Sequence, residues 1–205
     1  MIDRQLRVSL ACVGFALFSA NALAEVQTAT LENATLTIDT DTNDFKIKAL
    51  RNNSFQVTYL TDGKGAPYAN LPSMALPEEA TSAVTKDIAG DVELEETATT
   101  LTLKFNNISA HVDKSTHVIS YSVNGKVVAK EQDGLNISDN GVSLSFALDE
   151  NEKLYGGGQR VLGMDRRGHS MPLYNKAHYG YTTSSNQMYF GLSAVMSSKN
   201  YSVLF

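Results

Sequence analysis

The chain has 205 residues, of which 42% are hydrophobic and 19% are charged, and its mean hydropathy is −0.18. These values are typical of one soluble globular domain and argue against a disordered chain or a set of membrane-spanning segments. Lys and Arg number 17 against 22 Asp and Glu, a formal charge of −5, so the sequence lacks the cationic surplus that a nucleic-acid partner requires.

Residues 1–24 have the pattern of a secretory signal peptide. Arg4 and Arg7 precede an apolar run over residues 8–18, and small residues follow up to Ala24. We expect cleavage after Ala24 and a periplasmic or secreted mature protein. A membrane anchor is the alternative, but a helix needs about 20 apolar residues to cross a bilayer, more than this run provides. We therefore expect no membrane contact after cleavage.

Cys12 is the only cysteine of the chain. A lipoprotein signal at this residue is a minor alternative, because Ser9 stands where such signals carry a large aliphatic side chain. Once residues 1–24 are removed, the mature chain has no thiol, which excludes disulfides, cysteine nucleophiles and thiolate metal sites. The mature domain, residues 25–205, then depends on an ordinary hydrophobic core for its stability.

The mature chain is predicted to consist mainly of short strands. Period-two alternation and β-branched side chains mark eight segments, whereas few stretches carry a helical pattern. The segments are Ala34–Ile38, Ser54–Leu60, Thr99–Phe105, His117–Val123, Lys126–Lys130, Val142–Leu148, Met188–Val195 and Tyr201–Phe205. The acidic run Glu93–Glu96 alternates with apolar residues and is predicted to be the solvent-exposed face of a further strand.

The dipeptide Asn124-Gly125 is the strongest local signal for a hairpin. A two-residue turn at this position pairs Val123 with Lys126. The same register pairs Tyr121 with Val128.

Residues 61–86 contain three prolines and no clear period, so we expect a long loop there, with at most a short edge strand. Many short strands separated by turn residues predict an all-β fold, an antiparallel β-sandwich, rather than alternating helices and strands.

Residues 156–158 are three consecutive glycines. A phosphate-binding loop does not fit, because no Lys-Ser or Lys-Thr pair follows and no helix is predicted to begin there. We expect instead that the glycines let two backbones approach closely at the end of a strand.

The last 50 or so residues resemble a known family. The resemblance is carried, in order and spacing, by Tyr155–Arg160, Arg167–Gly168, Tyr174–Tyr181, Met188–Gly191 and Ser197–Lys199. These segments resemble the N-terminal domain of glycoside hydrolase family 31, which contains α-glucosidases, α-xylosidases and 4-α-glucosyltransferases. Gly157-Gly158-Gln159 and Asp165-Arg166-Arg167 are most similar to the bacterial 4-α-glucosyltransferase branch. The resemblance implies a galactose-mutarotase-like β-sandwich.

Enzymes of this family cleave α-glycosidic bonds with retention, using two carboxyl groups that lie on a (β/α)8 barrel. The family's nucleophile segment contains a Trp, and this chain has none. The resemblance therefore implies that the chain stops before the barrel, which would be its intramolecular partner. We expect no catalytic residue, no cofactor and no metal site in this chain, and no activity from the chain alone.

A loop of this domain lines the sugar site in the family. The matching positions are Asn175, Lys176, His178, Tyr179 and Tyr181. The resemblance implies that the two tyrosines stack on pyranose rings and that the polar side chains bond hydroxyls of an α-linked oligosaccharide. Packing of the tyrosines against the sandwich or the barrel is the alternative.

Two other functions fit parts of the sequence. A free-standing carbohydrate-binding sandwich would need neither barrel nor catalytic acids. A small epimerase would need a His and a Glu for proton transfer, and Glu152 lies near the glycines, but no histidine is spaced to pair with it.

Three arginines, Arg160, Arg166 and Arg167, lie close to Asp165 in the chain. We expect a solvated turn held by ion pairs rather than direct contacts to substrate.

Overall fold

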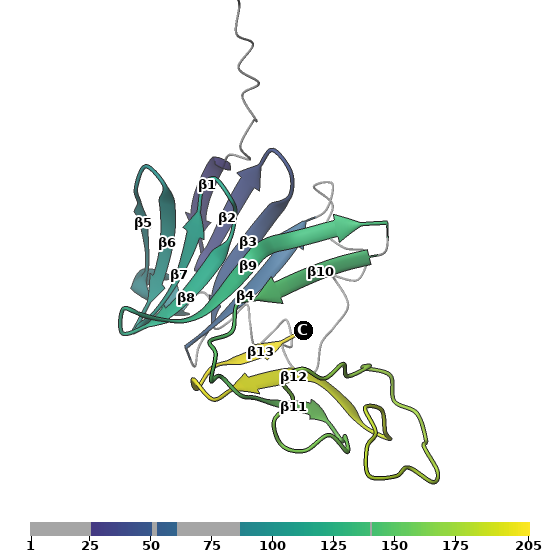
Figure 1. The fold of residues 1–205 in the computed structure, drawn as a ribbon. Helices are drawn as coiled ribbons and strands as arrows, with labels where there is room; N and C mark the ends of the chain where they lie inside the picture. The colour runs from purple at the N-terminus through teal and green to yellow at the C-terminus, as the bar shows by residue number, and fades with distance from the viewer. Residues whose placement is uncertain (1–25, 51–52, 61–86, 140) are drawn as a thin grey trace, which may run out of the picture.

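The computed structural model describes residues 26–50, 53–60, 87–139 and 141–205. The predicted signal peptide and the predicted loop over residues 61–86 lie outside this part of the chain. Within it, no helix is both long and apolar enough to cross a membrane. Figure 1 shows two sheets packed face to face and a third, smaller sheet below them.

The first sheet has four antiparallel strands in chain order: β1 (Val26–Glu32), β2 (Thr35–Thr40), β3 (Asp44–Leu50) and β4 (Ser54–Leu60). In β3 the side chains of Phe45, Ile47 and Ala49 are buried, and the intervening lysines point away from the core. This alternation follows from the two-residue period of a strand.

The second sheet has six antiparallel strands in the order β10-β9-β8-β7-β6-β5. The strands are β5 (Val92–Glu96), β6 (Thr100–Phe105), β7 (Ile108–Asp113), β8 (Ile119–Val123), β9 (Lys126–Ser138) and β10 (Gly141–Phe146). A short 3-10 turn, η2 (Ala89–Asp91), leads into β5. Each connection is short, so the sheet is a simple meander.

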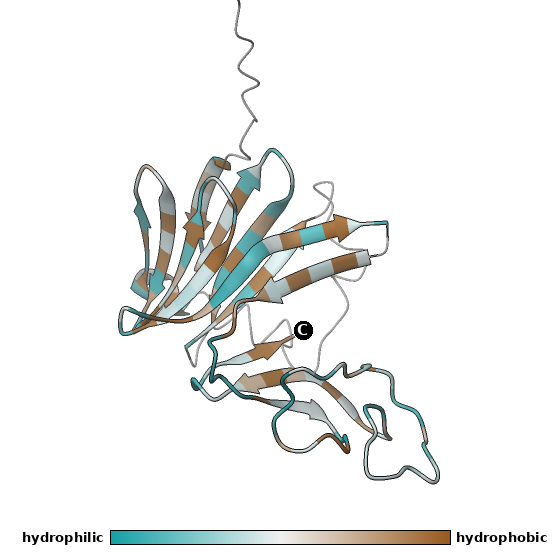
Figure 2. Ribbon diagram, viewed as in Figure 1, coloured by the Kyte–Doolittle hydropathy of each residue, from teal (hydrophilic) through white to brown (hydrophobic). Residues whose placement is uncertain are grey.

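The hydrophobic core lies between these two sheets. Its fully buried large apolar side chains are Leu36, Ile38, Phe45 and Ile47 from the first sheet and Leu101, Leu103, Val112 and Ile119 from the second. Full burial of such a side chain is worth about 1.5–3 kcal/mol. The alternating brown and teal bands in Figure 2 show the same division into core and solvent faces. The predicted antiparallel β-sandwich is confirmed.

One carboxylate, Glu131 on β9, is buried inside the sandwich. The Tyr59 hydroxyl donates a hydrogen bond to its Oε1 at 3.1 Å, and the Ile119 N–H donates to its Oε2 at 3.0 Å. Burial raises the pKa of Glu131 despite these bonds. Glu131 thus links the two sheets, because Tyr59 belongs to β4.

The hairpin at Asn124-Gly125 forms with positive φ at both residues, and Val123 pairs with Lys126 as predicted. The second predicted pair is wrong. Tyr121 pairs with Ala129 rather than with Val128, because a bulge shifts the register after Tyr121.

All eight predicted segments overlap a strand, and the acidic run Glu93–Glu96 lies on the exposed edge strand β5. The limits differ most in two places. β9 continues well beyond Lys130, and β12 begins at Gly191 rather than at Met188. Strands β1, β3, β7 and β11 lie outside the predicted segments, although β3 alternates as regularly as any of them.

The third sheet contains β11 (Leu154–Gly158), β12 (Gly191–Ser197) and β13 (Ser202–Leu204), paired antiparallel in this order. Residues 159–190 connect β11 to β12 and contain every candidate saccharide-binding residue. Within this connection, an isolated antiparallel β-bridge pairs Val161 with Ser185, which brings its two ends together.

Candidate functional site

The glycines of β11 allow the close backbone approach that the sequence predicts. A Cβ on Gly156 would lie 2.6 Å from the Ala194 carbonyl oxygen, and one on Gly158 would lie 2.5 Å from the Phe190 carbonyl oxygen. Both glycines also have positive φ, which other residues rarely adopt. Only glycine therefore lets β11 approach β12 at this distance.

Arg160 follows the glycines and is buried, with 8% of its surface exposed. Its Nη1 donates to the carbonyl oxygens of Gln159 at 2.7 Å and Phe190 at 2.9 Å, and its Nη2 donates to that of Pro172 at 2.6 Å. The guanidinium group thus ties both ends of the saccharide-loop candidate, residues 172–190, to the end of β11.

The predicted ion pairs at the arginine turn are wrong. Arg166 donates from Nε to the Gly156 carbonyl oxygen at 3.2 Å, and Arg167 donates from Nη1 to that of Glu152 at 2.9 Å. Asp165 accepts two main-chain N–H groups, each at 3.1 Å, and these bonds lower its pKa. The turn is therefore held by side chains bonded to the backbone.

The five predicted saccharide-binding residues lie in a segment with no helix or regular strand. Asn175 is used internally, since its Oδ1 accepts the Gly191 N–H at 2.5 Å. Lys176 is exposed. Tyr179 is 86% exposed and Tyr181 is 48% exposed, so Tyr179 does not pack against the sandwich.

His178 and Tyr179 are brought together with Tyr189. The Nδ1 of His178 lies 3.2 Å from Ser185 Oγ and 3.3 Å from the Gln187 carbonyl oxygen. The Tyr189 hydroxyl donates to the His178 carbonyl oxygen at 3.3 Å. The rings of Tyr179 and Tyr189 meet edge to face, with centroids 6.3 Å apart and an interplanar angle of 81°.

Sequence reasoning did not assign Tyr189 to the site. Only the structure separates it from its neighbours, since Met188 is buried whereas Tyr189 and Phe190 are 42% and 53% exposed although both are aromatic. The structure thus adds a second aromatic wall beside Tyr179, while Asn175 acts mainly as a support.

Glu152, the only acid considered for an epimerase, is buried at the base of the third sheet. It accepts hydrogen bonds from the Ser197 hydroxyl, from the Tyr201 hydroxyl at 2.7 Å and from the Asp149 N–H at 3.0 Å. Burial acts to raise the pKa of Glu152, but these bonds and nearby Lys199 outweigh it and hold the pKa below its usual value. In the described part of the chain no histidine bonds to Glu152, so the geometry gives the epimerase hypothesis no support.

The loop itself carries no acid. No Asp or Glu follows Asp165 in the sequence. No group of three His, Cys, Asp or Glu side chains that could hold a metal ion occurs among the described residues. The loop can therefore contact a sugar through aromatic and neutral polar groups, but it cannot supply the two carboxyl groups that retaining hydrolysis requires.

One face of the third sheet is apolar and open to solvent. Leu192 and Met196 on β12 and Leu204 on β13 are 44%, 53% and 57% exposed. They lie on the same side, since Leu204 pairs with Ala194, midway between the other two. Figure 2 shows brown segments on both strands. We call these three residues the apolar face.

The two-layer antiparallel sandwich and its appended sheet define a mutarotase-like β-sandwich domain. Residues 28–205 match the family described as the glycosyl hydrolase 31 N-terminal galactose mutarotase-like domain, and the chain belongs to this family. The resemblance to the N-terminal domain of glycoside hydrolase family 31 is thereby confirmed. No curated protein matches the chain.

Several solved structures share this fold. The GH31 dextranase of Flavobacterium johnsoniae, complexed with isomaltotriose, aligns with a TM-score of 0.75 at 17% identity, over 89% of this chain and 22% of that protein. The cycloalternan-forming enzyme of Listeria monocytogenes, with a pentasaccharide substrate, gives a TM-score of 0.66 at 14% identity, over 87% and 17%. A GH31 α-xylosidase from a soil metagenome, with xylose, gives 0.61 at 19% identity, over 87% and 28%. The chain spans about a fifth of the length of these enzymes.

Proposed function

We propose that this chain is the N-terminal domain of a secreted family 31 enzyme acting on α-linked oligosaccharides, and that residues 172–190 contact the sugar beside a catalytic barrel. The observation that carries the proposal is the strongly exposed Tyr179, set against Tyr189 on a loop whose ends are tied down by Arg160. Membership of the family supports the substrate class.

The loop suits a sugar because its aromatic rings offer flat apolar surfaces next to hydrogen-bonding groups. Tyr179, Tyr181 and Tyr189 supply rings, while Lys176 and the free ring nitrogen of His178 supply polar partners for hydroxyl groups. The bonds from Arg160 and Asn175 hold the loop before the sugar arrives, which lowers the entropy cost of binding.

The bond-breaking step belongs to another part of the enzyme. Retaining hydrolysis needs two carboxyl groups about 5 Å apart, and the loop has none. The apolar face would pack on the barrel, since such exposed patches mark interaction sites. The chain alone is therefore inactive, and measurable turnover of an aryl α-glucoside by the purified chain would contradict this assignment.

The contact to sugar is tested by NMR titration of the isotopically labelled chain with isomaltotriose. We expect weak binding, with shift changes confined to residues 172–190, and a loss of about 3–10-fold in affinity for Tyr179→Ala. The matched control is Phe205→Ala, which removes a 67% exposed aromatic side chain outside residues 172–190. No shift changes in the loop, or equal effects of the two substitutions, would refute the sugar contact.

A further inference from the structure

His178, on the saccharide-loop candidate, is an exposed side chain whose two ring nitrogens are in different situations. Its Nδ1 lies 3.2 Å from Ser185 Oγ and 3.3 Å from the Gln187 carbonyl oxygen. Its Nε2 has no hydrogen-bond partner among the residues that the structure describes. The nitrogens of a neutral imidazole have opposite hydrogen-bonding roles, so the partners of Nδ1 determine what Nε2 can bind.

The partners of Nδ1 leave it only the role of donor. The Gln187 carbonyl oxygen can only accept a hydrogen bond. The Ser185 hydroxyl donates its single hydrogen to that same carbonyl oxygen at 2.7 Å, so its oxygen has only lone pairs to offer His178. In the neutral ring Nδ1 therefore carries the proton, and Nε2 carries a lone pair that accepts hydrogen bonds.

The bonded side of the ring is held in place by the fold. Ser185 is buried, with 8% of its surface exposed. Its N–H donates to the Val161 carbonyl oxygen and its carbonyl oxygen accepts the Val161 N–H, both at 2.9 Å. The backbone of His178 is held as well, because the Tyr189 hydroxyl donates to its carbonyl oxygen at 3.3 Å. These contacts fix the direction of Nε2 before a ligand arrives.

We propose that His178 is a specificity-determining residue, which selects sugars with a free hydroxyl group beside the ring that stacks on Tyr179. This hydroxyl donates a hydrogen bond to Nε2. An ether oxygen, as in a methylated sugar, can only accept a hydrogen bond, as Nε2 does. Lys176 makes no such distinction, because its ammonium group donates to either kind of oxygen. The inference rests on the proposed function, since it assigns the recognition of hydroxyl groups in the same loop to one residue.

The first test determines the tautomer by NMR of the full chain, labelled with nitrogen-15 at histidine, in mildly alkaline buffer without sugar. We expect the His178 signals to show a protonated Nδ1 and an unprotonated Nε2. His169 is the internal control, because it is exposed and its ring bonds to no residue in the described part of the chain. A proton on Nε2 of His178, or the same mixture of tautomers in both residues, would overturn the inference.

The second test is NMR titration with isomaltotriose and with fully O-methylated isomaltotriose. We expect isomaltotriose to shift Nε2 of His178 more than Nδ1, and to bind about 3–10-fold more weakly to His178→Asn. Asparagine keeps an N–H group near the position of Nδ1 and has no acceptor at that of Nε2. His169→Asn is the matched control and should bind like the parent chain. The methylated sugar should bind the parent more weakly than isomaltotriose does, and this difference should shrink in His178→Asn.

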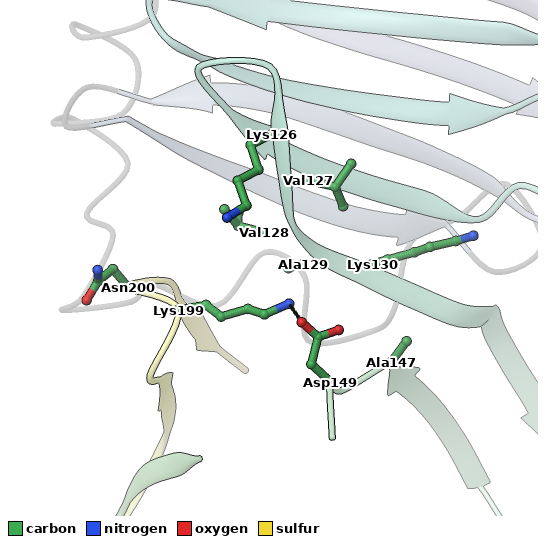
Figure 3. A pocket seen from close by; sticks show the side chains of 9 residues that line it. All are labelled: Lys126, Val127, Val128, Ala129, Lys130, Ala147, Asp149, Lys199 and Asn200. Carbon is green, nitrogen blue, oxygen red and sulfur yellow. Dashed lines mark ion pairs between the residues drawn. The ribbon is translucent and has the colours of Figure 1, made fainter. Parts of the chain in front are cut away.

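An alternative binding place for the sugar is a cavity of about 670 Å³ between β9 and the turn that joins β12 to β13. Figure 3 shows its lining, in which Lys199 forms an ion pair with Asp149. None of residues 172–190 lines this cavity, so the shifts distinguish the two places. Isomaltotriose shifts at Ala147, Asp149 and Asn200, without shifts at His178, would place the sugar in the cavity and overturn the inference.

Equal affinities of His178→Asn and His169→Asn for isomaltotriose would also overturn it, as would equal binding of the two sugars by the parent chain. In both cases shifts in residues 172–190 and a weakened Tyr179→Ala variant would still support the proposed function. No shift anywhere in this loop would refute the sugar contact itself, and the role of His178 with it.

Discussion

The sandwich and the third sheet, with its loops, hold their shapes by different means. Among the described residues, all the buried apolar side chains except Met188 belong to the sandwich side of the chain, residues 26–129. Of the 14 exposed large hydrophobic side chains in the part of the chain that the structure describes, 11 lie between residues 164 and 205. The sandwich is therefore stabilised by its own core, whereas the third sheet is held mainly by close glycine contacts and buried polar bonds.

The two regions also differ in net charge. Residues 154–205 contain five Lys and Arg and one Asp, a net charge of +4, while the rest of the chain has 12 basic and 21 acidic residues, a net charge of −9. Residues 154–205 thus combine exposed apolar side chains with a positive net charge. We expect this combination in a region that packs against another protein surface. The comparison predicts that substitutions in the two regions affect stability separately. The expected loss of stability is largest for a core side chain, smaller for a glycine of the third sheet, smaller again for a buried glutamate and smallest for an exposed apolar side chain.

The largest effect is expected for Phe45→Ala in the sandwich. Phe45 is 1% exposed and packs against the Tyr59 ring, so its truncation leaves a cavity and lowers the free energy of unfolding by about 3–5 kcal/mol. Phe190→Ala, at a 53% exposed phenylalanine next to the third sheet, is the control and is expected to change it little. Chemical denaturation measures both. Equal losses would show that the third sheet shares one core with the sandwich.

Gly158→Ala tests the third sheet directly. The added Cβ would lie 2.5 Å from the Phe190 carbonyl oxygen and 2.7 Å from the Leu192 nitrogen, at a φ of +84°, so the β11–β12 pair must open. We expect a local loss of about 1–3 kcal/mol, seen as faster hydrogen exchange of β11 and β12 amides with unchanged exchange in the sandwich. Gly90→Ala, where a Cβ meets nothing within 4 Å, is the control. Slower folding of the sandwich in Gly158→Ala would contradict the separation of the two regions.

The sequence predicts a feature well when the residues that interact are close together in the chain, and poorly when they are far apart. The Asn124-Gly125 turn was predicted because both residues of the signal are adjacent, but the bulge that places Tyr121 opposite Ala129 depends on how β9 packs. Glu131 looks like an ordinary surface residue, since its partner Tyr59 lies 72 positions away. Long-range polar contacts of this kind have no local pattern.

The candidate site shows the same limit. Asp165 is near Arg160 in the chain, so an ion pair was expected, yet Arg160 bonds the carbonyl oxygens of Pro172 and Phe190, which only the fold brings together. The glycine contacts at residues 156–158 were foreseen, because a run of three glycines has few other uses in a strand. The aromatic pair of Tyr179 and Tyr189 needed the structure.

Smaller effects are expected at the two buried glutamates, whose pKa values are shifted in opposite directions. The pKa of Glu152 is below the ordinary 4.5, so its stabilisation is present above pH 4.5 and is lost as the pH falls through the folded-state pKa. The pKa of Glu131 is raised, so its contribution is present below pH 4.5 and is lost as the pH rises through its folded-state value. Acid should therefore loosen the third sheet while favouring the sandwich.

Glu152→Gln checks this difference. We expect a loss of about 1.5–3 kcal/mol of local stability at neutral pH and a flatter acid dependence of hydrogen exchange in β12 and β13. Glu131→Gln is the matched variant and is expected to flatten the opposite dependence, in the amides of β8 and β9. If both substitutions change the same amides, Glu152 and Glu131 stabilise one cooperative unit and the distinction between the regions is wrong.

The smallest effect on stability, and the clearest on association, is expected at the apolar face. Leu192→Gln and Met196→Gln change side chains that are 44% and 53% exposed, so the free energy of unfolding should move by no more than about 0.5 kcal/mol. Because the face has no partner within the described chain, we expect the isolated protein to associate through it, and the double variant to sediment as a monomer at concentrations where the parent does not. Val142→Gln, at a 63% exposed valine on β10, is the control. Equal loss of association in this control would show that any exposed apolar side chain suffices, and that the third sheet has no dedicated docking face.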